Sequence, residues 1–142
     1  MSDVVVDSSV VAKWFAPEPN SVKARRLLKD VPAAGDRLVI LDLAFAEVAN
    51  AIWNKHRRKL MTRAEAEGSI ANLLNSPLHA ESAARLLKSA FEIAVKYDRA
   101  VYDAMFVALA HDLGIKGVTA DEPLYNTTHA DFPQIMLLRN WP

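Results

Sequence analysis

The sequence predicts an α/β fold in which a mostly parallel sheet of roughly five strands is flanked by helices. Short apolar runs, typical of buried strands, alternate along the chain with longer amphipathic segments, typical of helices. This alternation favours parallel strands joined by right-handed helical crossovers. Half of the 142 residues are apolar, which is enough for one well-buried core, so we expect residues 1–142 to form a single domain.

The first strand is predicted from three consecutive β-branched residues, Val4–Val6, a pattern that indicates burial on both faces of the sheet. Ser8 and Ser9 are suitable caps for a short helix that runs to about Phe15. The prolines within residues 16–20 end this helix.

The next predicted elements are a helix, a strand and a longer helix, over residues 21–29, 38–41 and 43–59. In the first of these helices Val22, Leu27 and Leu28 are expected to point inward. Asp42 is expected to cap the longer helix, whose cationic last turn suits the negative end of the helix dipole.

A capping box marks the second half of the chain. Thr62 and Glu65 have the spacing of this motif, which predicts a helix to about Leu74. A strand, two helices and two strands separated by a turn are expected over residues 77–80, 81–97, 99–113, 118–119 and 135–138. Gly114 suits the C-cap position of the second of these helices.

Four acidic residues in apolar surroundings are the strongest functional signal: Asp7, Glu47, Asp103 and Asp121. Two follow predicted strands and two lie near the starts of helices, so all four can meet at the carboxyl edge of the sheet. An unpaired buried carboxylate is costly, and few cations lie near these residues in the sequence. Oxygen ligands for a hard divalent cation explain all four acids at once.

Each acid also has an ordinary explanation, which the sequence leaves open. Asp7 and Asp121 are favoured helix caps, and Asp103 would suit the positive start of a helix. Glu47 belongs to a polar helix face that could simply be solvated. Ser9 is placed to bond a ligand carboxylate or a metal-bound water if Asp7 is a ligand.

The 17 basic and 17 acidic side chains cancel, but a neutral total is compatible with a basic rim around an acidic pocket. Cations that could hold phosphates there, or that could be only solvated helix ends, are Lys13, His56, Arg57, Arg58, Lys59 and Arg99. Trp14 and Trp53 are expected in the core. The absence of cysteine excludes disulfides and thiolate chemistry. No signal peptide or membrane span is recognised, so a cytoplasmic protein is expected.

Four segments carry a family resemblance: Val5–Val10, Ala46–Asn50, Tyr102–Ala110 and Thr119–Asp121. In their order and spacing the chain resembles PIN-domain proteins, specifically VapC-type toxins of toxin–antitoxin pairs. The resemblance implies a Rossmann-like α/β/α sandwich, Mg²⁺- or Mn²⁺-dependent endoribonuclease activity, an antitoxin that blocks the active site, and homodimers.

The family roles carry over by position. Asp7, Glu47 and Asp103 match the three most characteristic acids, Asp121 matches a fourth that varies more, and Ser9 matches a common Ser or Thr. Phosphodiester hydrolysis would then use metal held by Asp7 and Asp103, with Glu47 and Asp121 as direct or water-mediated ligands. Lys13, Arg57 and Arg58 are the expected RNA contacts.

Two other functional classes remain open at this point. A phosphoaspartate enzyme of the receiver or haloacid-dehalogenase type also has an Asp after its first strand. The dehalogenase type would need Asp-x-Asp where Asp7 is followed by Ser8 and Ser9, and the receiver type gives no reason for Glu47 or Asp103. The other class is a non-catalytic binding module on the same fold. DNA in place of RNA is a further variant of the nuclease interpretation.

Overall fold

The computed structural model describes residues 2–142, which form one sheet of five parallel strands in the order β3-β2-β1-β4-β5. Along the chain these strands are β1 (Val4–Val6), β2 (Leu38–Leu41), β3 (Leu78–Glu81), β4 (Lys116–Thr119) and β5 (Ile135–Leu137). The predicted parallel sheet is confirmed. The strand order switches direction between β1 and β4, and such a switch point is where ligands bind in open α/β sheets.

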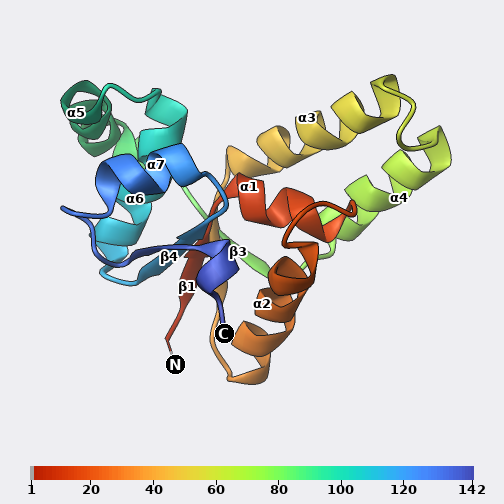
Figure 1. Cartoon of the computed structure of the whole chain (residues 1–142), viewed down its shortest axis with the longest axis horizontal. Coiled ribbons are helices and arrows are strands. Elements are labelled where there is room, and N and C mark those ends of the chain that lie inside the picture. Colours follow the sequence, from red (N-terminus) through yellow and green to blue (C-terminus); the bar gives the residue numbers. More distant parts are fainter. Residues whose placement is uncertain (1) are drawn as a thin grey trace.

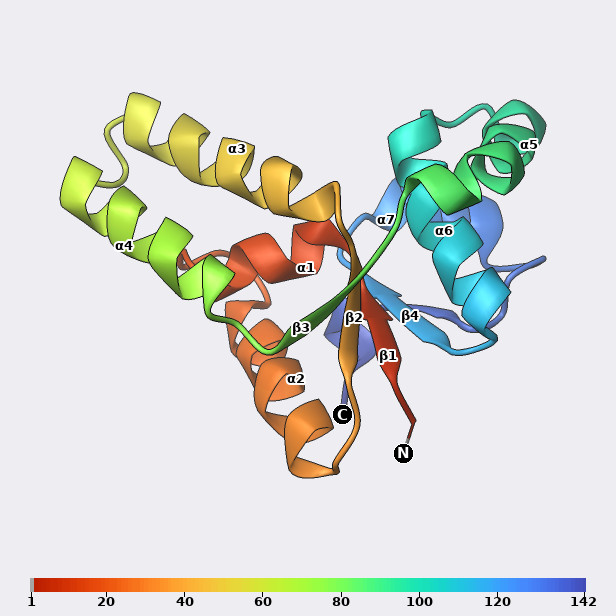
Figure 2. The same ribbon diagram turned by 180° about the vertical axis from the view of Figure 1, so that it is seen from behind.

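Helices lie on both sides of the sheet, so the molecule has three layers (Figures 1 and 2). One layer holds α5 (Leu87–Tyr97), α6 (Val101–Leu113) and α7 (Glu122–Thr128). The other side holds α1 (Ser8–Val11), α2 (Ser21–Ala33), α3 (Ala44–Arg57) and α4 (Arg63–Leu74). Short 3₁₀ turns cover Ala12–Trp14, Ala84–Leu86 and Leu138–Asn140. This arrangement confirms the α/β/α sandwich.

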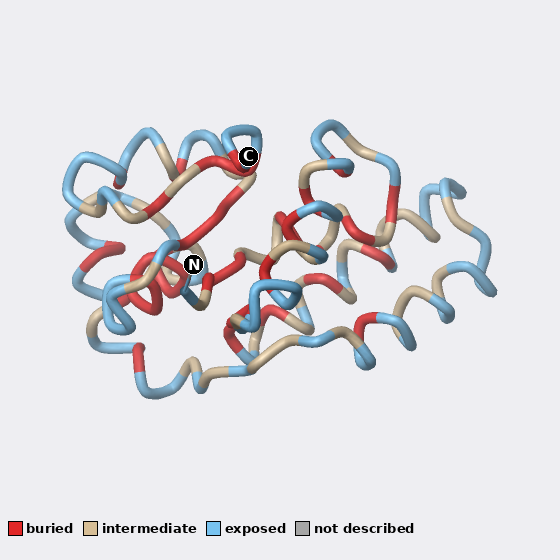
Figure 3. Tube along the Cα trace, turned by 90° about the horizontal axis from the view of Figure 1, so that it is seen from below, coloured by how far each residue is buried: buried red, intermediate tan, exposed pale blue. Residues whose placement is uncertain are grey.

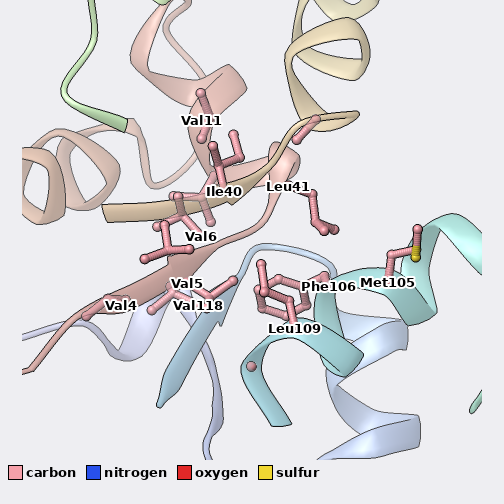
Figure 4. Packing of buried hydrophobic residues seen from close by; sticks show 14 of the residues in the cluster. Val4, Val5, Val6, Val11, Ile40, Leu41, Met105, Phe106, Leu109 and Val118 are labelled. Carbon is pink, nitrogen blue, oxygen red and sulfur yellow. The ribbon is translucent and has the colours of Figure 1, made fainter. Parts of the chain in front are cut away.

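The core fills both sides of β1. Val4–Val6 are all buried, as the run of β-branched residues predicted. Figure 4 shows Phe106 on the α6 side of β1, and Val11 with Ile40 on the opposite side. Every residue of α6 from Ala104 to Ala110 is buried, because this helix lies between the sheet and α5. Each large apolar side chain buried in this way contributes about 1.5–3 kcal/mol to the free energy of unfolding.

A close approach of α6 to β4 explains the glycine in the middle of that strand. A Cβ atom at Gly117 would lie 2.9 Å from Cζ of Phe106 and 3.1 Å from Cδ1 of Ile135. Only a residue without a side chain allows this packing, which brings the amino-terminal turn of α6 over the switch point.

Two predicted helix starts are wrong. Asp42 does not cap α3, whose N-cap is Leu43; the Asp42 carboxylate instead accepts a hydrogen bond from the N–H of Ala83. The helix expected from residue 81 begins at Leu87, because β3 continues to Glu81 in register with β2. Both errors arise because residues that local patterns assign to the start of a helix instead belong to a paired strand or directly follow one.

The segment after Asp121 was predicted as a turn and is the two-turn helix α7. Its threonines and asparagine favour helices weakly, which is why the sequence did not predict it. Asp121 caps it with its side chain, Pro123 occupies the first turn, and Leu124 and Thr128 are buried against the rest of the fold. Tertiary burial therefore overrides weak local propensity here.

Helices α3 and α4 form an arm that extends away from the sheet (Figures 1 and 3). The predicted capping box of Thr62 and Glu65 is present, and Leu73 is the one buried residue of α4. Trp53 of α3 is 53% exposed, and Val22 of α2 is 68% exposed, so both were wrongly expected to point inward.

Trp14 and Leu27 lie in the core as predicted, and Leu28 is partly buried. None of the helices within residues 2–142 combines the length and apolar character needed to cross a bilayer.

Candidate active site

Asp7 follows β1 directly and lies at the switch point of the sheet. Its Oδ2 atom accepts hydrogen bonds from the hydroxyls of Ser9 and Thr119, each at 2.8 Å. The same two hydroxyls accept backbone N–H groups, from Ala120 to Ser9 and from Asp121 to Thr119, each at 3.1 Å. Because these bonds use oxygen lone pairs, the hydroxyl protons are directed at Asp7. The carboxylate is therefore held in one orientation by Ser9 of α1 and Thr119 of β4.

The pKa of the Asp7 carboxyl is raised above its ordinary value, chiefly because burial removes the charge from water. Hydrogen bonds from Thr119, Ser9 and the backbone of Ser8 oppose this shift, and the nearby charge of Asp103 adds to it. The side chain of Asp7 makes no cap to helix α1, so its interpretation as a simple helix cap is not supported. The environment of Asp7 favours a neighbouring cation.

Glu47 lies in the first turn of α3 and is partly buried beside Asp7. Its pKa is also raised, first by burial and then by the charge of Asp7, while a hydrogen bond with the Ser8 side chain opposes the shift. Asp7, Ser8 and Glu47 line one small depression together with Tyr102, which is 68% exposed. Glu47 thus belongs to the same acidic region as Asp7 and not to a fully solvated helix face.

Arg99 forms ion pairs with the other two acids, Asp103 and Asp121. Its Nη2 atom lies 3.0 Å from Oδ2 of Asp103 and 3.4 Å from Oδ2 of Asp121. The second oxygen of Asp121 accepts the N–H of Leu124 at 3.1 Å, so its interpretation as a helix cap is correct as well. The expectation that few cations lie near the acids therefore fails for this half of the site, because Arg99 contacts both Asp103 and Asp121.

The structure brings all four acids to the carboxyl edge of β1 and β4, where Asp103 influences both Asp7 and Glu47 electrostatically. No three His, Cys, Asp or Glu side chains within residues 2–142 form a ready-made metal site. The donor set of carboxylates beside a hydroxyl still fits a hard cation in its chemistry. The guanidinium of Arg99 already places positive charge between two of the carboxylates.

The predicted RNA contacts lie at different distances from these acids. Lys13 lines a cavity of about 400 Å³ with Asp121, and its Nζ atom is 3.6 Å from Glu18. Arg57 is exposed in the last turn of α3, ten residues or about 15 Å along the helix from Glu47, and the exposed Arg58 follows as the C-cap. Only Lys13 of these three adjoins the acidic region.

Lys59, another of the candidate cations, is exposed next to Arg58 beyond the end of α3. His56 is engaged locally, since its Nδ1 lies 3.0 Å from the carbonyl oxygen of Met61. Neither residue adjoins the carboxylates.

Sequence reasoning missed Thr119 and gave Arg99 only a place on the rim. Arg99 precedes Asp103 by four residues, a spacing that often indicates an ion pair, although Arg99 lies just before the helix. Thr119 carried a weaker signal, as the last residue of a strand that leads to Asp121. Its bond to Asp7 spans 112 positions, so no local pattern could reveal it.

A family model described as PIN domain matches residues 4–130. The chain belongs to the PIN-domain family. Ribonuclease VapC3 of Pyrobaculum aerophilum is 39% identical over 123 residues, which are 85% of this chain and 91% of that protein. This PIN-domain membership sets aside the receiver and haloacid-dehalogenase alternatives, because those enzymes belong to other families.

Solved structures agree with this PIN fold. PAE2754 from Pyrobaculum aerophilum has a TM-score of 0.74 at 22% identity, with 98% of this chain and 93% of that chain covered. Mycobacterium tuberculosis VapC20, described as a sarcin–ricin loop cleaving toxin, has a TM-score of 0.66 at 20% identity, with 88% and 95% covered. A toxin–antitoxin complex from Klebsiella pneumoniae has a TM-score of 0.67 at 14% identity, with 95% and 97% covered.

Proposed function

We propose that this PIN-domain protein is a Mg²⁺- or Mn²⁺-dependent endoribonuclease and the toxin of a type II toxin–antitoxin pair. The observation that carries the proposal is the gathering of Asp7, Glu47, Asp103 and Asp121 at the switch point of a parallel sheet. The 39% identity to a protein named a ribonuclease supports RNA as the substrate. In this proposal residues 1–142 act as one nuclease domain in the cytoplasm, the compartment of the RNA substrate.

The acids and the hydroxyls of the candidate site would have different roles in phosphodiester hydrolysis. Asp7 and Asp103 would hold the cation, and Glu47 and Asp121 would support it directly or through water. A bound divalent metal supplies an acidified water and charge stabilisation at the phosphate. Ser9 and Thr119 keep the Asp7 carboxylate in its orientation through the hydrogen bonds described above.

Positive side chains would bind the RNA backbone around this region. Lys13 is the nearest candidate, since it lines the same cavity as Asp121. Arg57 and Arg58 at the end of α3 would contact more distant phosphates of a bound RNA.

The alternatives are a metal-dependent nuclease that is not a toxin, acting on RNA or DNA, and a catalytically silent binding module.

The test is RNA cleavage by Asp103→Asn with Asp112→Asn as the matched control on the same helix. Asp103 contacts Arg99 within the acidic region, whereas Asp112 is exposed and pairs with Arg85. We expect cleavage to fall by about a hundredfold or more for Asp103→Asn, to stay near the parent rate for Asp112→Asn, and to stop in EDTA. Parent-like cleavage by Asp103→Asn, or full cleavage in EDTA, would remove the proposed mechanism.

An antitoxin is the proposed protein partner, and the α3–α4 arm provides a surface for it. A groove of about 390 Å³ lies between these helices and includes Ile52, Trp53, Ala66 and Ile70. Trp14 is buried in the core and does not line this groove. An amphipathic helix of the antitoxin would fit its apolar face here, with a cationic side chain reaching the acids.

Bacterial growth tests this part of the proposal. We expect expression of the chain alone to arrest a bacterial host, and Asp7→Ala to relieve the arrest. Asp112→Ala should remain toxic, because its side chain lies outside the acidic region. Co-expression of the proposed antitoxin should restore growth. Harmless expression of soluble parent protein would favour a nuclease without a toxin role, or a binding module.

A further inference from the structure

Arg99 lies in the short connection between α5 and α6, where the backbone is held firmly. The preceding Asp98 adopts a left-handed conformation with φ 53°, and the N–H of Arg99 donates to the carbonyl of Ala94 at 3.1 Å. This geometry ends α5 and directs the Arg99 side chain toward the acidic region, where only 22% of it is exposed. The side chain is thus a fixed part of the site and not a mobile surface arginine.

The guanidinium of Arg99 uses only part of its hydrogen-bonding capacity. One nitrogen, Nη2, serves both Asp103 and Asp121, at 3.0 and 3.4 Å. The Nε atom is buried and finds no hydrogen-bond partner among residues 2–142. Arginine binds carboxylates best through two parallel N–H bonds, so this contact falls short of its optimum. Charge attraction, rather than a full set of hydrogen bonds, holds Arg99 here.

The acidic region is consequently divided into two unequal parts. Asp103 and Asp121 share a cation of the chain itself. Asp7 and Glu47 form no ion pair with any Lys, Arg or His of residues 2–142. A divalent cation is attracted to the unpaired part, but it needs Asp103 as well, and Oδ2 of Asp103 is already in contact with Arg99.

We propose that Arg99 is a built-in counter-ion that competes with divalent metal for Asp103 and Asp121 and so sets the metal concentration that the site requires. This inference rests on the proposed function, since it concerns the same carboxylates. Without metal, Arg99 reduces the repulsion between Asp103 and Asp121. With metal, the positive charges repel each other at short range, so Arg99 must release Asp103 before the metal is fully bound. Arg99 is a positioning residue in this role.

Arg85 provides a matched control. It also bridges two acids, with Nη1 2.6 Å from Asp112 and Nη2 3.6 Å from Glu81, but neither acid belongs to the candidate site. An arginine that only strengthens the fold should behave as Arg85 does. Loss of either arginine would then change thermal stability without changing metal affinity.

The experiment measures binding of Mn²⁺ alone, from the electron paramagnetic resonance signal of the free ion. Arg99→Gln and Arg99→Met are compared with Arg85→Gln and the parent chain. We expect the half-saturating Mn²⁺ concentration to fall by about three- to tenfold in both Arg99 variants and to stay unchanged in Arg85→Gln. The melting temperature without metal should fall in the Arg99 variants and recover at saturating Mn²⁺.

A second measurement needs no variant. The side-chain ¹⁵Nε–H resonance of Arg99 in the parent chain should shift as Mg²⁺ is added, while that of Arg85 should not. An unchanged or weaker Mn²⁺ affinity in folded Arg99 variants, or an Arg99 resonance indifferent to Mg²⁺, would overturn the proposal. Failure of the nuclease proposal would look different, because the parent would bind Mn²⁺ competitively with Arg99 but leave RNA uncut.

Discussion

At the scale of single residues, the charge of Asp7 is the feature with the most direct consequence for stability. Burial raises the pKa of this carboxyl, and the two hydroxyls of Ser9 and Thr119 oppose the shift only in part. The folded chain therefore keeps the Asp7 proton to a higher pH than the unfolded chain does. Above that range the ionised group lowers the free energy of unfolding, and this loss disappears as pH falls through the raised pKa toward the ordinary value of 3.8.

We accordingly predict that Asp7→Asn raises the melting temperature of metal-free protein at neutral pH by roughly 2–4 °C. The gain should shrink as pH falls through the raised pKa and vanish below the ordinary value of 3.8, where Asp7 is protonated in both states. Thermal unfolding in EDTA across this pH range measures it.

Glu65→Gln is a control of opposite sign for this experiment. The backbone N–H of Thr62 lowers the pKa of Glu65, so its stabilisation is present above the ordinary value of 4.5 and is lost as pH falls. A metal-free Asp7→Asn protein that melts below the parent at neutral pH would show that Asp7 is not a source of strain.

At the scale of elements, the packing of α6 on β4 decides where Asp103 is placed relative to Asp121. Gly117 allows this packing, since a Cβ there would lie within 3.1 Å of Ala110 and Ile135 and nearer still to Phe106. Helix α6 could move away to admit a side chain, but that movement would also displace its first turn from the acidic region.

We predict that Gly117→Ala lowers the free energy of unfolding by about 1–3 kcal/mol. Gly68→Ala is the matched control, because a Cβ at Gly68 meets nothing within 4 Å and the residue lies inside helix α4. That change should raise the free energy of unfolding by about 0.5–1 kcal/mol. Urea unfolding measures both, and a neutral Gly117→Ala would mean that α6 can shift without cost.

At the scale of the whole molecule, α5 presents an apolar stripe to solvent. Leu87, Phe91 and Val95 follow one another at intervals of four residues and are 51%, 61% and 68% exposed. Lys88 and Glu92 flank the stripe. If the α5 helices of two copies pack antiparallel, Lys88 of each copy lies opposite Glu92 of the other. We propose this face as the contact of the expected homodimer.

Phe91→Lys should therefore convert the protein to a monomer, because it places a charge in the centre of the contact. Leu74→Lys is the control, since Leu74 is 72% exposed on α4 and lies outside the stripe. Light scattering after size-exclusion chromatography distinguishes the two states. A parent chain that is monomeric at high concentration, or a dimeric Phe91→Lys, would rule out this contact.

Much of this architecture could be read from the sequence. The alternation of apolar runs and amphipathic segments predicted the five parallel strands and most of the helices, because burial within one element follows its own period. The positions of Asp7 and Asp121 after strands, and of Glu47 and Asp103 in first helical turns, were readable for the same reason. The local sequence also carried the capping box of α4.

Contacts between elements were decided only by the tertiary structure. Thr119 reaches Asp7, and Arg99 reaches Asp121, because the strand order places β1 beside β4 and the start of α6 above them. The formation of α7 and the exposure of Val22 likewise depend on which neighbours cover them. A local pattern records how one element distributes its own apolar side chains. It contains no information on how helices and strands pack against one another. That packing determines which charged side chains come into contact in the candidate site.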